Sequence, residues 1–453
     1  MTRSPPRSTK STRPRVKSPV RSRARTPARP PVEGPNFSTA DHKWMDRALA
    51  LALRGRGTTR PNPMVGAVLV RNGRLLAEGY HQRAGLPHAE REALAAIQSA
   101  SHPGGGWAGG DPPRGIARGA TLYVTLEPCC HTGRTPPCTD ALIASGVERV
   151  VVGLQDPNPL VNGQGIARLR RAGIRVDVGC RGAEAQAQNR SFLTWVEHGR
   201  PWVTLKVAAT LDGFIADWSM PTTRATAPGP IWLTGEEARR AAHVLRAEHD
   251  AILVGAGTVL ADDPLLTVRL PDPGSLFPAA GSPEARRARG KAGKVHVEAR
   301  LPVRQPLRVV LDGRLRISPT ARLLGSASAS AQTLVFSSAM APRQKASALE
   351  AAGAEVVRMP GQGSRVHLTE VLQELATRGI QSVLVEGGAD VHAAFISAGL
   401  VDGVAVFQAP LLLGGGVPIA RGQGRGVASA LRLGPLEVQR FGDDLCVRAD
   451  VLR

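Results

Sequence analysis

The first half of the chain alternates between stretches with helical and with strand-like spacing of apolar residues. From Asp41 to Gly55 apolar residues recur every three or four positions, and the glycine marks the end of this helix. Met64–Val70 and Arg74–Tyr80 then predict two strands, because Asn72-Gly73 between them favours a tight hairpin turn. The segment therefore begins with a helix and a hairpin.

The same alternation continues to residue 192. After His88 the sequence predicts a helix, a buried strand, a helix, a strand, a helix, a strand and a polar helix. In chain order these are Ala89–Ala100, Thr121–Leu126, Pro137–Ser145, Val147–Leu154, a segment ending at Arg171, Ile174–Val178 and Gly182–Phe192. Such alternation is typical of an α/β/α layer sandwich.

Apolar strands recur in the second half, where two of them lead into glycine turns. The predicted strands are Val203–Ala208, Ala251–Gly255, Leu307–Asp312 and Ser382–Gly388. A strand, a glycine turn and a helix in succession suit an anion, since free N–H groups and the helix dipole favour negative charge. None of these turns carries the G-x-G-x-x-G of a Rossmann dinucleotide site. The pattern predicts a second α/β domain of another type.

Residues 1–37 differ in composition from the rest, being rich in Arg, Ser, Thr and Pro, which predicts a disordered basic tail. The first 36 residues hold ten Lys or Arg and one Glu, so +9 of the net charge of +21 lies there. A nucleic-acid-binding arm and an organelle transit peptide both fit such a segment. We favour a solvated, dispensable tail, because this composition has almost nothing to bury.

Length and cysteine content limit the remaining possibilities. With 453 residues the chain is too long for one ordinary domain, and we divide it into the tail, a domain over 38–183 and a domain over 200–453. Five cysteines do not suggest a disulfide framework and favour a reducing, cytoplasmic location. No apolar run approaches the ~20 residues of a membrane helix, so we expect no membrane partner.

Two short motifs carry the candidate chemistry. They are His88-Ala89-Glu90 and E-P-C-C-H-T-G-R-T-P-P-C, which runs from Glu127 to Cys138. One imidazole and two separated cysteines give zinc three ligands and leave the open position that a catalytic zinc needs to activate water. H-x-E followed by P-C and a later cysteine is the zinc deaminase signature. A packing role for these residues is the plainer alternative, but the conjunction of the motifs favours the metal.

With its long gap between cysteines, the second motif closely resembles the deaminase half of the bifunctional riboflavin-biosynthesis deaminase/reductase family. P-N-P-M-V-G at Pro61–Gly66, the run from Gly79 to Glu90 and D-P-N-P at Asp156–Pro159 fit the same family. The resemblance implies three zinc ligands, a proton shuttle and a pyrimidine contact. These are, in that order, His88, Cys129 and Cys138, then Glu90, then Asn62.

Two residues of the cysteine loop are left outside the ligand set. Cys130 stands where the family often has serine, and we do not assign it as a ligand. His131 matches a family histidine and is a candidate substrate contact.

Residues 200–453 resemble the reductase half of that family, which is similar in fold to dihydrofolate reductase. The resemblance implies NADPH contacts at Ala208, Trp232, Thr258, Asp262, Gly388, Ala389, Asp390, Val391, His392, Ala393 and Ala394. It implies substrate contacts at Lys206, Arg246, Leu266, Arg269 and Glu386. Arginines suit a ribose phosphate, because a guanidinium binds phosphate oxygens in pairs.

By this resemblance the chain makes a riboflavin precursor in two steps. The first is zinc-dependent deamination of 2,5-diamino-6-ribosylamino-4(3H)-pyrimidinone 5′-phosphate. The second is NADPH-dependent reduction of the ribosyl group to ribityl. We expect a homo-oligomer that binds this small pyrimidine ribose-phosphate and no specific nucleic acid.

Some features leave alternatives open. Lys206 on its strand can also be read as a solvated edge charge. Pro230 and Gly313 stand where the family usually has serine, which allows a deaminase with an inactive reductase domain. The basic tail and the shared zinc chemistry allow a nucleic-acid deaminase, although the long cysteine gap and the reductase-like half oppose it.

Overall fold

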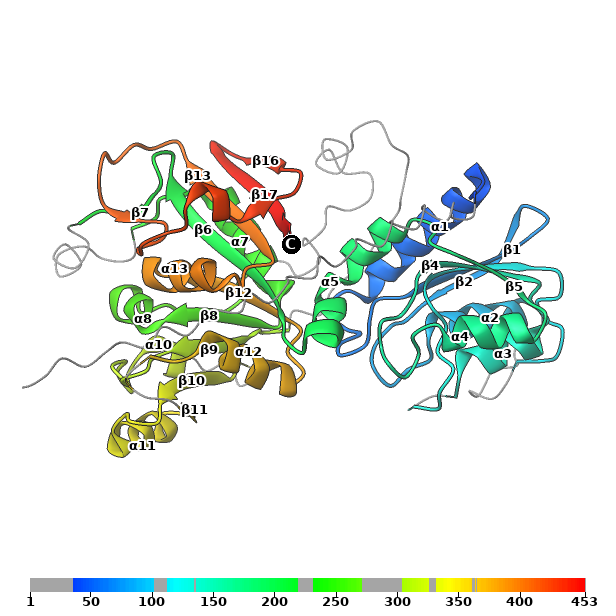
Figure 1. The fold of residues 1–453 in the computed structure, drawn as a ribbon, viewed down its shortest axis with the longest axis horizontal. Coiled ribbons are helices and arrows are strands. Elements are labelled where there is room, and N and C mark those ends of the chain that lie inside the picture. Colours follow the sequence, from blue (N-terminus) through cyan, green and yellow to red (C-terminus); the bar gives the residue numbers. More distant parts are fainter. Residues whose placement is uncertain are drawn as a thin grey trace, which may run out of the picture. The chain divides into compact units, whose positions relative to one another are not determined.

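The computed structural model describes residues 36–101, 112–133, 136–218, 231–270, 304–325, 331–360, 363 and 365–452. The predicted basic tail therefore lies outside the described residues, apart from its last two positions. So do Pro230 and nearly all of a basic insertion at 271–304. Residues Phe37–Arg453 form one compact unit, and its described parts contain two large sheets (Figure 1).

The first sheet has five strands in the order β2-β1-β3-β4-β5. Its strands are β1 (Gly66–Arg71), β2 (Arg74–Tyr80), β3 (Thr121–Leu126), β4 (Arg149–Leu154) and β5 (Arg175–Val178). β1 pairs antiparallel with both β2 and β3, whereas β3, β4 and β5 run parallel. The predicted hairpin is confirmed, since Asn72 and Gly73 have φ of 51° and 72° as a tight turn requires.

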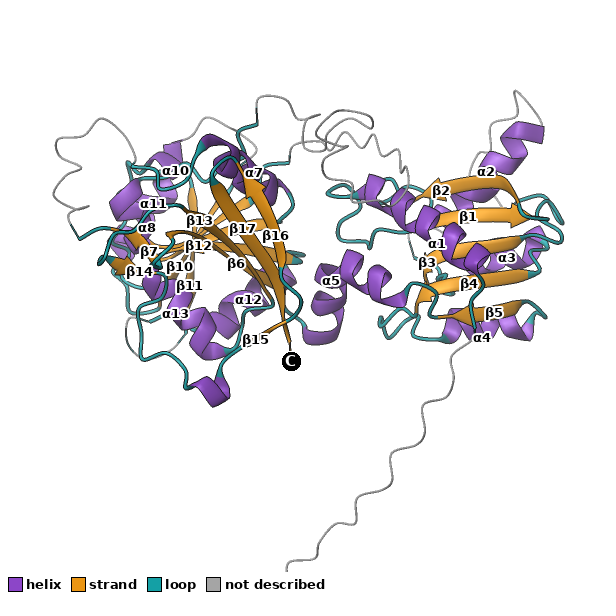
Figure 2. Ribbon diagram, turned by 90° about the horizontal axis from the view of Figure 1, so that it is seen from above, coloured by secondary structure: helices purple, strands orange, loops and turns teal. Residues whose placement is uncertain are grey.

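Helices cover both faces of this sheet (Figure 2). α1 (Thr39–Ala52), extended by the 3₁₀ turn η1 (Leu53–Gly55), and α5 (Gly182–His198) pack on one face against Val68 and Tyr123. α2 (Ala89–Ser101), α3 (Cys138–Ser145) and α4 (Gln164–Arg171) pack on the other, against side chains such as Leu122 and Val150. The predicted α/β/α sandwich is confirmed.

The second sheet has ten strands in the order β11-β10-β9-β8-β12-β6-β13-β17-β15, with β16 also pairing with β17. Its strands are β6 (Trp202–Thr210), β8 (Ala251–Gly255), β9 (Leu307–Leu311), β10 (Thr333–Ser338), β11 (Ala354–Met359), β12 (Ser382–Gly387), β13 (Gly403–Ala409), β15 (Arg432–Leu433), β16 (Glu437–Phe441) and β17 (Asp444–Leu452). β17 joins antiparallel to the parallel strands. A separate pair joins β7 (Phe214–Ala216) to β14 (Val417–Pro418).

The helices of the second half also lie on both faces of their sheet, which explains why its strands read as unbroken apolar runs. The helices are α7 (Glu236–Ala247), α8 (Ala256–Asp262), α10 (Arg322–Gly325), α11 (Arg343–Ala351), α12 (Leu368–Thr377), α13 (Ala389–Ala398) and the 3₁₀ turn η3 (Val427–Ser429). α12 and α13 share a core with Val203 and Leu205, whereas Ile252 and Val310 face α8, α10 and α11. The mixed α/β second domain is thus confirmed.

Lys206 lies on an interior strand, because β6 runs between β12 and β13. Its side chain is only 15% exposed and faces Glu386. The alternative that it is a solvated edge charge is therefore wrong.

Two predicted boundaries differ from those in the structure, one at β1 and one at α5. The Asn189 side chain accepts a hydrogen bond from Met64 N at 2.8 Å and donates one to Met64 O at 2.9 Å. Because these backbone groups are bonded to Asn189, β1 begins at Gly66 rather than at Met64. The helix predicted over Gly182–Phe192 continues to His198, with a non-helical residue at Asn189 (φ −107°).

Within the described ranges, no helix combines the length and the apolar character that crossing a membrane would need.

A buried carboxylate ties α1 to the sheet behind it. Asp41 is 4% exposed and accepts hydrogen bonds from Ser38 N (3.0 Å), Tyr123 Oη (2.9 Å) and the Arg149 guanidinium (2.7 Å). Burial alone would raise the pKa of Asp41, but the hydrogen bonds from Arg149, Ser38 and Tyr123 outweigh it and hold the pKa well below its usual range.

Asp41→Asn is expected to destabilise the first domain by about 2–4 kcal/mol at neutral pH, because the partly buried Arg149 guanidinium loses its anionic acceptor. A group with a lowered folded pKa stabilises above its unfolded pKa of about 4 and stops doing so as pH falls. Thermal unfolding of the two proteins should therefore differ most at neutral pH and converge in acid. Equal melting temperatures at pH about 7 would contradict this role.

Candidate functional site

The structure brings His88, Cys129 and Cys138 together at one end of the first sheet. His88 directly precedes α2, Cys129 follows β3, and Cys138 is the first residue of α3. Their ligand atoms all lie within 4.8 Å of one another. His88 Nδ1 is 3.5 Å from Cys129 Sγ and 3.4 Å from Cys138 Sγ.

These separations fit a tetrahedral zinc ion. Zinc–nitrogen and zinc–sulfur bonds of typical length at a tetrahedral angle place the two ligand atoms about 3.6 Å apart. The chemistry of the donors also fits, because one imidazole and two thiolates are common zinc ligands. The Cys130 sulfur instead lies 3.7 Å from Leu160 O and does not join the cluster.

Two acidic groups at this cluster have shifted pKa values. A hydrogen bond with the Cys138 thiol lowers the pKa of Cys129, and a second one with His88 lowers it further. Burial raises the pKa of Glu90, which is 3% exposed in the first turn of α2. A carboxyl group with a raised pKa beside the cluster is suited to accept and return a proton.

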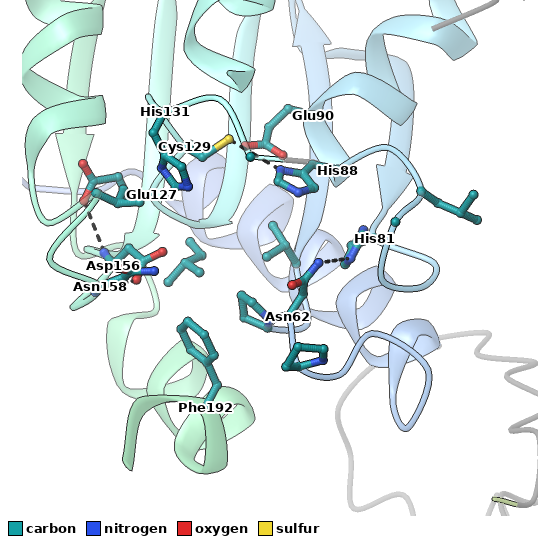
Figure 3. A pocket seen from close by; sticks show the side chains of 18 of the residues that line it. Asn62, His81, His88, Glu90, Glu127, Cys129, His131, Asp156, Asn158 and Phe192 are labelled. Atoms are coloured by element: carbon teal, nitrogen blue, oxygen red, sulfur yellow. Dashed lines mark hydrogen bonds between the residues drawn. The ribbon is translucent and has the colours of Figure 1, made fainter. Parts of the chain in front are cut away.

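The cluster opens into a cavity of about 370 Å³ (Figure 3). Its wall combines the metal-site residues with polar and aromatic side chains from α5 and from the loops at this end of the sheet. Among the lining residues are Asn62, His81, His88, Glu90, Glu127, Cys129, His131, Asp156, Asn158, Phe192 and Trp195. The predicted contacts Asn62 and His131 thus lie in one cavity with the predicted metal ligands.

Asn62 is oriented by a histidine. Asn62 Nδ2 lies 3.0 Å from His81 Nε2, and His81 Nδ1 lies 3.0 Å from Pro87 O. Since a carbonyl only accepts, we assign the proton to Nδ1, which leaves Nε2 to accept from the Asn62 amide. Burial lowers the pKa of His81, in keeping with the neutral ring that this assignment requires. His81 thus holds the amide nitrogen of Asn62, which leaves the side-chain carbonyl oxygen to accept a hydrogen bond from another group.

Asp156 and Asn158 line another part of the same cavity, after the end of β4 (Figure 3). Burial raises the pKa of Asp156 to about 6. Asp156 Oδ1 accepts a hydrogen bond from Asn158 N at 2.9 Å, which fixes the turn between them.

A second polar cluster joins three of the predicted reductase residues. Glu386, on β12, accepts two hydrogen bonds from Arg246 of α7, at 2.6 and 2.9 Å, and lies 3.8 Å from Lys206 Nζ on β6. Burial opposes ionisation of Glu386, but Arg246 and Lys206 outweigh it and lower the pKa to about 2. The buried carboxylate is therefore charged and paired.

Among the residues that the structure describes, no acid forms an ion pair with Arg269. Its guanidinium donates to Thr267 Oγ1 at 3.0 Å, and burial together with Arg246 and Arg322 lowers its pKa. Burial, Arg246 and Arg269 lower the pKa of His243 to about 4. Positive charges thus gather around Arg269 and His243, which suits an anionic ligand.

Leu266 lies in the turn leading to Arg269 and is strained. It is 2% exposed with φ 52°, a left-handed conformation that is costly for leucine. Such strain is most often kept where a turn must present its backbone to a ligand.

The predicted nucleotide contacts follow the carboxyl ends of neighbouring strands. A Cβ on Gly387 or on Gly388 (φ 84°) would lie 3.0 Å from Thr258 Oγ1, so only glycine leaves this turn open. His392 Nε2 is buried without a hydrogen-bond partner among the described residues. Open backbone and an unpaired donor or acceptor fit a bound nucleotide. The structure places Ala208 on β6, Asp262 at the end of α8, and Ala389–Ala394 in the first turns of α13.

Trp232 is a predicted NADPH contact, whereas Gly313 was noted only as a departure from the family. Trp232 is 58% exposed, with the Arg239 guanidinium 5.3 Å from its ring. Gly313 follows β9, and its carbonyl accepts a hydrogen bond from Ser338 N at 3.2 Å.

Several cavity residues were not assigned from the sequence. His81 and Asp156 stand inside motifs that signalled the family, but neither motif says which side chain faces the cavity. Phe192 and Trp195 carried no signal beyond helical spacing, since only the packing of α5 turns them into the cavity.

In comparisons with known proteins, two family models match separate parts of the chain. A family model for the cytidine and deoxycytidylate deaminase zinc-binding region matches residues 38–154, and one for the RibD C-terminal domain matches residues 201–447. The riboflavin biosynthesis protein RibD of Aquifex aeolicus is 39% identical over 407 residues, covering 90% of this chain and 97% of that protein. RibD of Escherichia coli is 38% identical over 414 residues, covering 90% and 98%.

Two solved structures are similar over almost the same length. Acinetobacter baumannii RibD has a TM-score of 0.70 at 35% identity, covering 91% of this chain and 99% of that one. A diaminohydroxyphosphoribosylaminopyrimidine deaminase/5-amino-6-(5-phosphoribosylamino)uracil reductase of Thermotoga maritima has a TM-score of 0.70 at 33% identity, with the same coverage.

Purified protein is expected to hold about one zinc ion per chain, as a three-ligand site implies. Cys138→Ser should empty the site, because a neutral hydroxyl replaces a thiolate ligand. Cys130→Ser is the matched control and should keep its zinc. Metal analysis of the two variants decides the ligand set, and loss of zinc from the Cys130 variant would show that the assignment is wrong.

Proposed function

This chain belongs to the family of the riboflavin biosynthesis protein RibD, and from that membership we propose how its residues divide a deamination and a reduction. The family acts in riboflavin biosynthesis as a bifunctional deaminase and reductase. We assign the deaminase to residues 38–183 and the reductase to residues 200–453. The observation that carries the assignment is the cluster of His88, Cys129 and Cys138, which lies beside a cavity lined by His88, Cys129 and Glu90.

The deaminase acts on 2,5-diamino-6-ribosylamino-4(3H)-pyrimidinone 5′-phosphate. His88, Cys129 and Cys138 would hold a zinc ion, which would supply water activated at neutral pH. Glu90 would accept a proton from the attacking water and pass it to the 2-amino group, which would leave as ammonia while a carbon–oxygen bond replaces the carbon–nitrogen bond. Asn62 contacts the pyrimidine, and Asp156 and Asn158 face it from another side of the cavity. The raised pKa of Glu90 supports its part as the proton carrier.

The reductase uses NADPH, which supplies the hydride that converts the ribosyl group to ribityl. The open turn at Gly387 and Gly388, the unpaired His392 nitrogen and the following helix α13 support a nucleotide there. Contacts of the cofactor also fall at Ala208, Trp232, Thr258 and Asp262.

The substrate of the reductase lies at the cation cluster. Glu386 and Lys206 hold the ribose side, and Arg269 binds the phosphate, because no acid among the described residues forms an ion pair with it. Arg246 acts mainly by holding Glu386, to which two of its nitrogens already donate.

Location and partners follow from the same activity. We propose a cytoplasmic enzyme, supported by five cysteines that form no disulfide, and a homo-oligomer that binds a small substrate rather than nucleic acid.

Assaying the wild-type protein with the aminopyrimidine phosphate, with and without NADPH, tests the proposal. Ammonia should appear without NADPH, and NADPH should be oxidised once deaminated substrate is present. Ammonia without NADPH oxidation would leave a deaminase with an inactive reductase domain. Deamination of an oligonucleotide in place of the small substrate would establish the nucleic-acid deaminase.

Arg269→Ala is expected to raise the reductase KM for the phosphorylated substrate about ten- to hundredfold, because a charge-assisted contact to phosphate is lost. The loss should nearly vanish with the dephosphorylated substrate. Equal KM values for variant and wild type on the phosphorylated substrate would place the phosphate elsewhere.

A further inference from the structure

Glu127 is a buried carboxylate that the deamination chemistry does not use. It is 4% exposed, lies two residues before the ligand Cys129, and is not a member of the ligand cluster. Both of its oxygens are occupied by backbone donors. Oε2 accepts from Asp156 N at 3.2 Å and from Gly163 N at 2.9 Å, and Oε1 accepts from Ile166 N at 3.1 Å.

Two of these donors belong to the start of α4. Gly163 is the N-cap of that helix, has φ 83°, and supplies no side chain to cap it. The first N–H groups of a helix lack partners within the helix and favour a negative charge. Glu127 therefore caps α4 from a distant part of the chain.

The third donor begins the loop that lines the cavity. Asp156 N points at Glu127, and the Asp156 carboxylate in turn accepts from Asn158 N at 2.9 Å (Figure 3). The turn continues as Asn158 O accepts from Val161 N at 2.7 Å. The whole segment from Asp156 to Ile166 is thus fastened at both ends to one side chain.

The metal loop meets this segment at close range. A Cβ on Gly165 would lie 2.1 Å from Pro128 O and 3.2 Å from Glu127 Oε1. Only glycine lets the first turn of α4 approach the backbone just before Cys129. Glu127 N also donates to Leu154 O at 2.9 Å, so the ends of β3 and β4 are joined directly beside it.

We propose that Glu127 is a positioning residue for the deamination: it fixes the loop bearing Asp156 and Asn158 at a set distance from the metal ligands. This inference rests on the proposed deaminase activity. Glu127 touches neither zinc nor substrate in this role. A carboxylate is required because one side chain must accept three N–H hydrogen bonds from the same segment. Since the backbone of Glu127 leads directly to the ligand Cys129, these bonds tie that segment to the metal site.

Glutamine cannot replace it, although its shape is nearly the same. The amide has one acceptor oxygen, and its NH₂ group would face at least one of the three N–H donors. The loop should then move away from the metal site, while Glu90 on α2, Cys138 on α3, and the ligands next to α2 and β3 keep their places.

The test is steady-state deamination by the full-length zinc-loaded protein carrying Glu127→Gln. The KM for the aminopyrimidine phosphate should rise about tenfold or more, with kcat changed far less and with about one zinc retained per chain. Glu127→Asp keeps both acceptor oxygens and should fall between the glutamine variant and wild type. If the glutamine variant does not fold, the aspartate variant decides the question by the same split between KM and kcat.

Asp41→Asn is the matched control, because Asp41 is a second buried carboxylate of the same domain that lies away from the cavity. It should lower the melting temperature and leave KM unchanged. An unchanged KM in the Glu127 variants, or an equal rise in the Asp41 variant, would overturn the proposal. An inactive wild-type protein would instead refute the proposed deaminase itself.

Discussion

Parallel pairing of neighbouring strands is the constraint on which both candidate sites depend. When two strands run parallel, their carboxyl ends meet at one edge of the sheet, and the loops that follow them become neighbours. In the first domain β3 leads to Cys129 and β4 leads to Asp156, so the metal loop and the cavity loop start side by side. In the second domain β8 leads to Thr258 and β12 to Gly388. Residues far apart in sequence thus share one site without a long-range motif.

Charge is balanced differently at the two sites, and the difference follows from burial. In the second domain the buried Glu386 is compensated by Arg246 and Lys206, which holds it ionised. In the first, His88 acts to lower the pKa of Glu90 and His131 that of Asp156, but burial outweighs these histidines and raises the pKa of each carboxyl group. An uncompensated carboxyl group can exchange a proton near neutral pH, whereas a paired one can only attract or orient. This contrast supports our proposal that proton transfer takes place at the first site and that a charged substrate is anchored at the second.

The sequence predicted local structure better than it predicted the sites. The strand Thr121–Leu126 and the helix after His88 were found almost to the residue, because apolar spacing and turn chemistry act over a few positions. The ligands His88, Cys129 and Cys138 were proposed from a motif, and the structure brings them together. What the sequence could not show were contacts set by packing. Asn189 bonds the Met64 backbone across 125 positions and so shifts the start of β1. The hydrogen bond between His81 and Asn62 forms only when the two loops that carry these residues are folded next to each other, so the sequence did not reveal it.

The long interval between the two cysteines does not by itself decide the reaction. Closing a longer loop costs little, since the entropy of closure grows only with the logarithm of its length. The ends of this loop are fixed by local bonds: Thr139 N donates to Cys129 O at 3.1 Å, and Cys138 N donates to Cys129 Sγ at 3.4 Å. Cys138 is the first residue of α3, and His88 directly precedes α2. The N-terminal ends of these two helices therefore lie at the ligands, and the dipole of a helix favours the thiolate form of a cysteine at that end. A shorter loop could bring the ligands to the same arrangement. Selectivity must then come from the rest of the cavity wall, where Asn62, Asp156 and Asn158 present polar groups around a space of about 370 Å³. That volume is of the size of a small-molecule pocket, which explains why a zinc chemistry shared with nucleic-acid deaminases here serves a single pyrimidine ribose-phosphate.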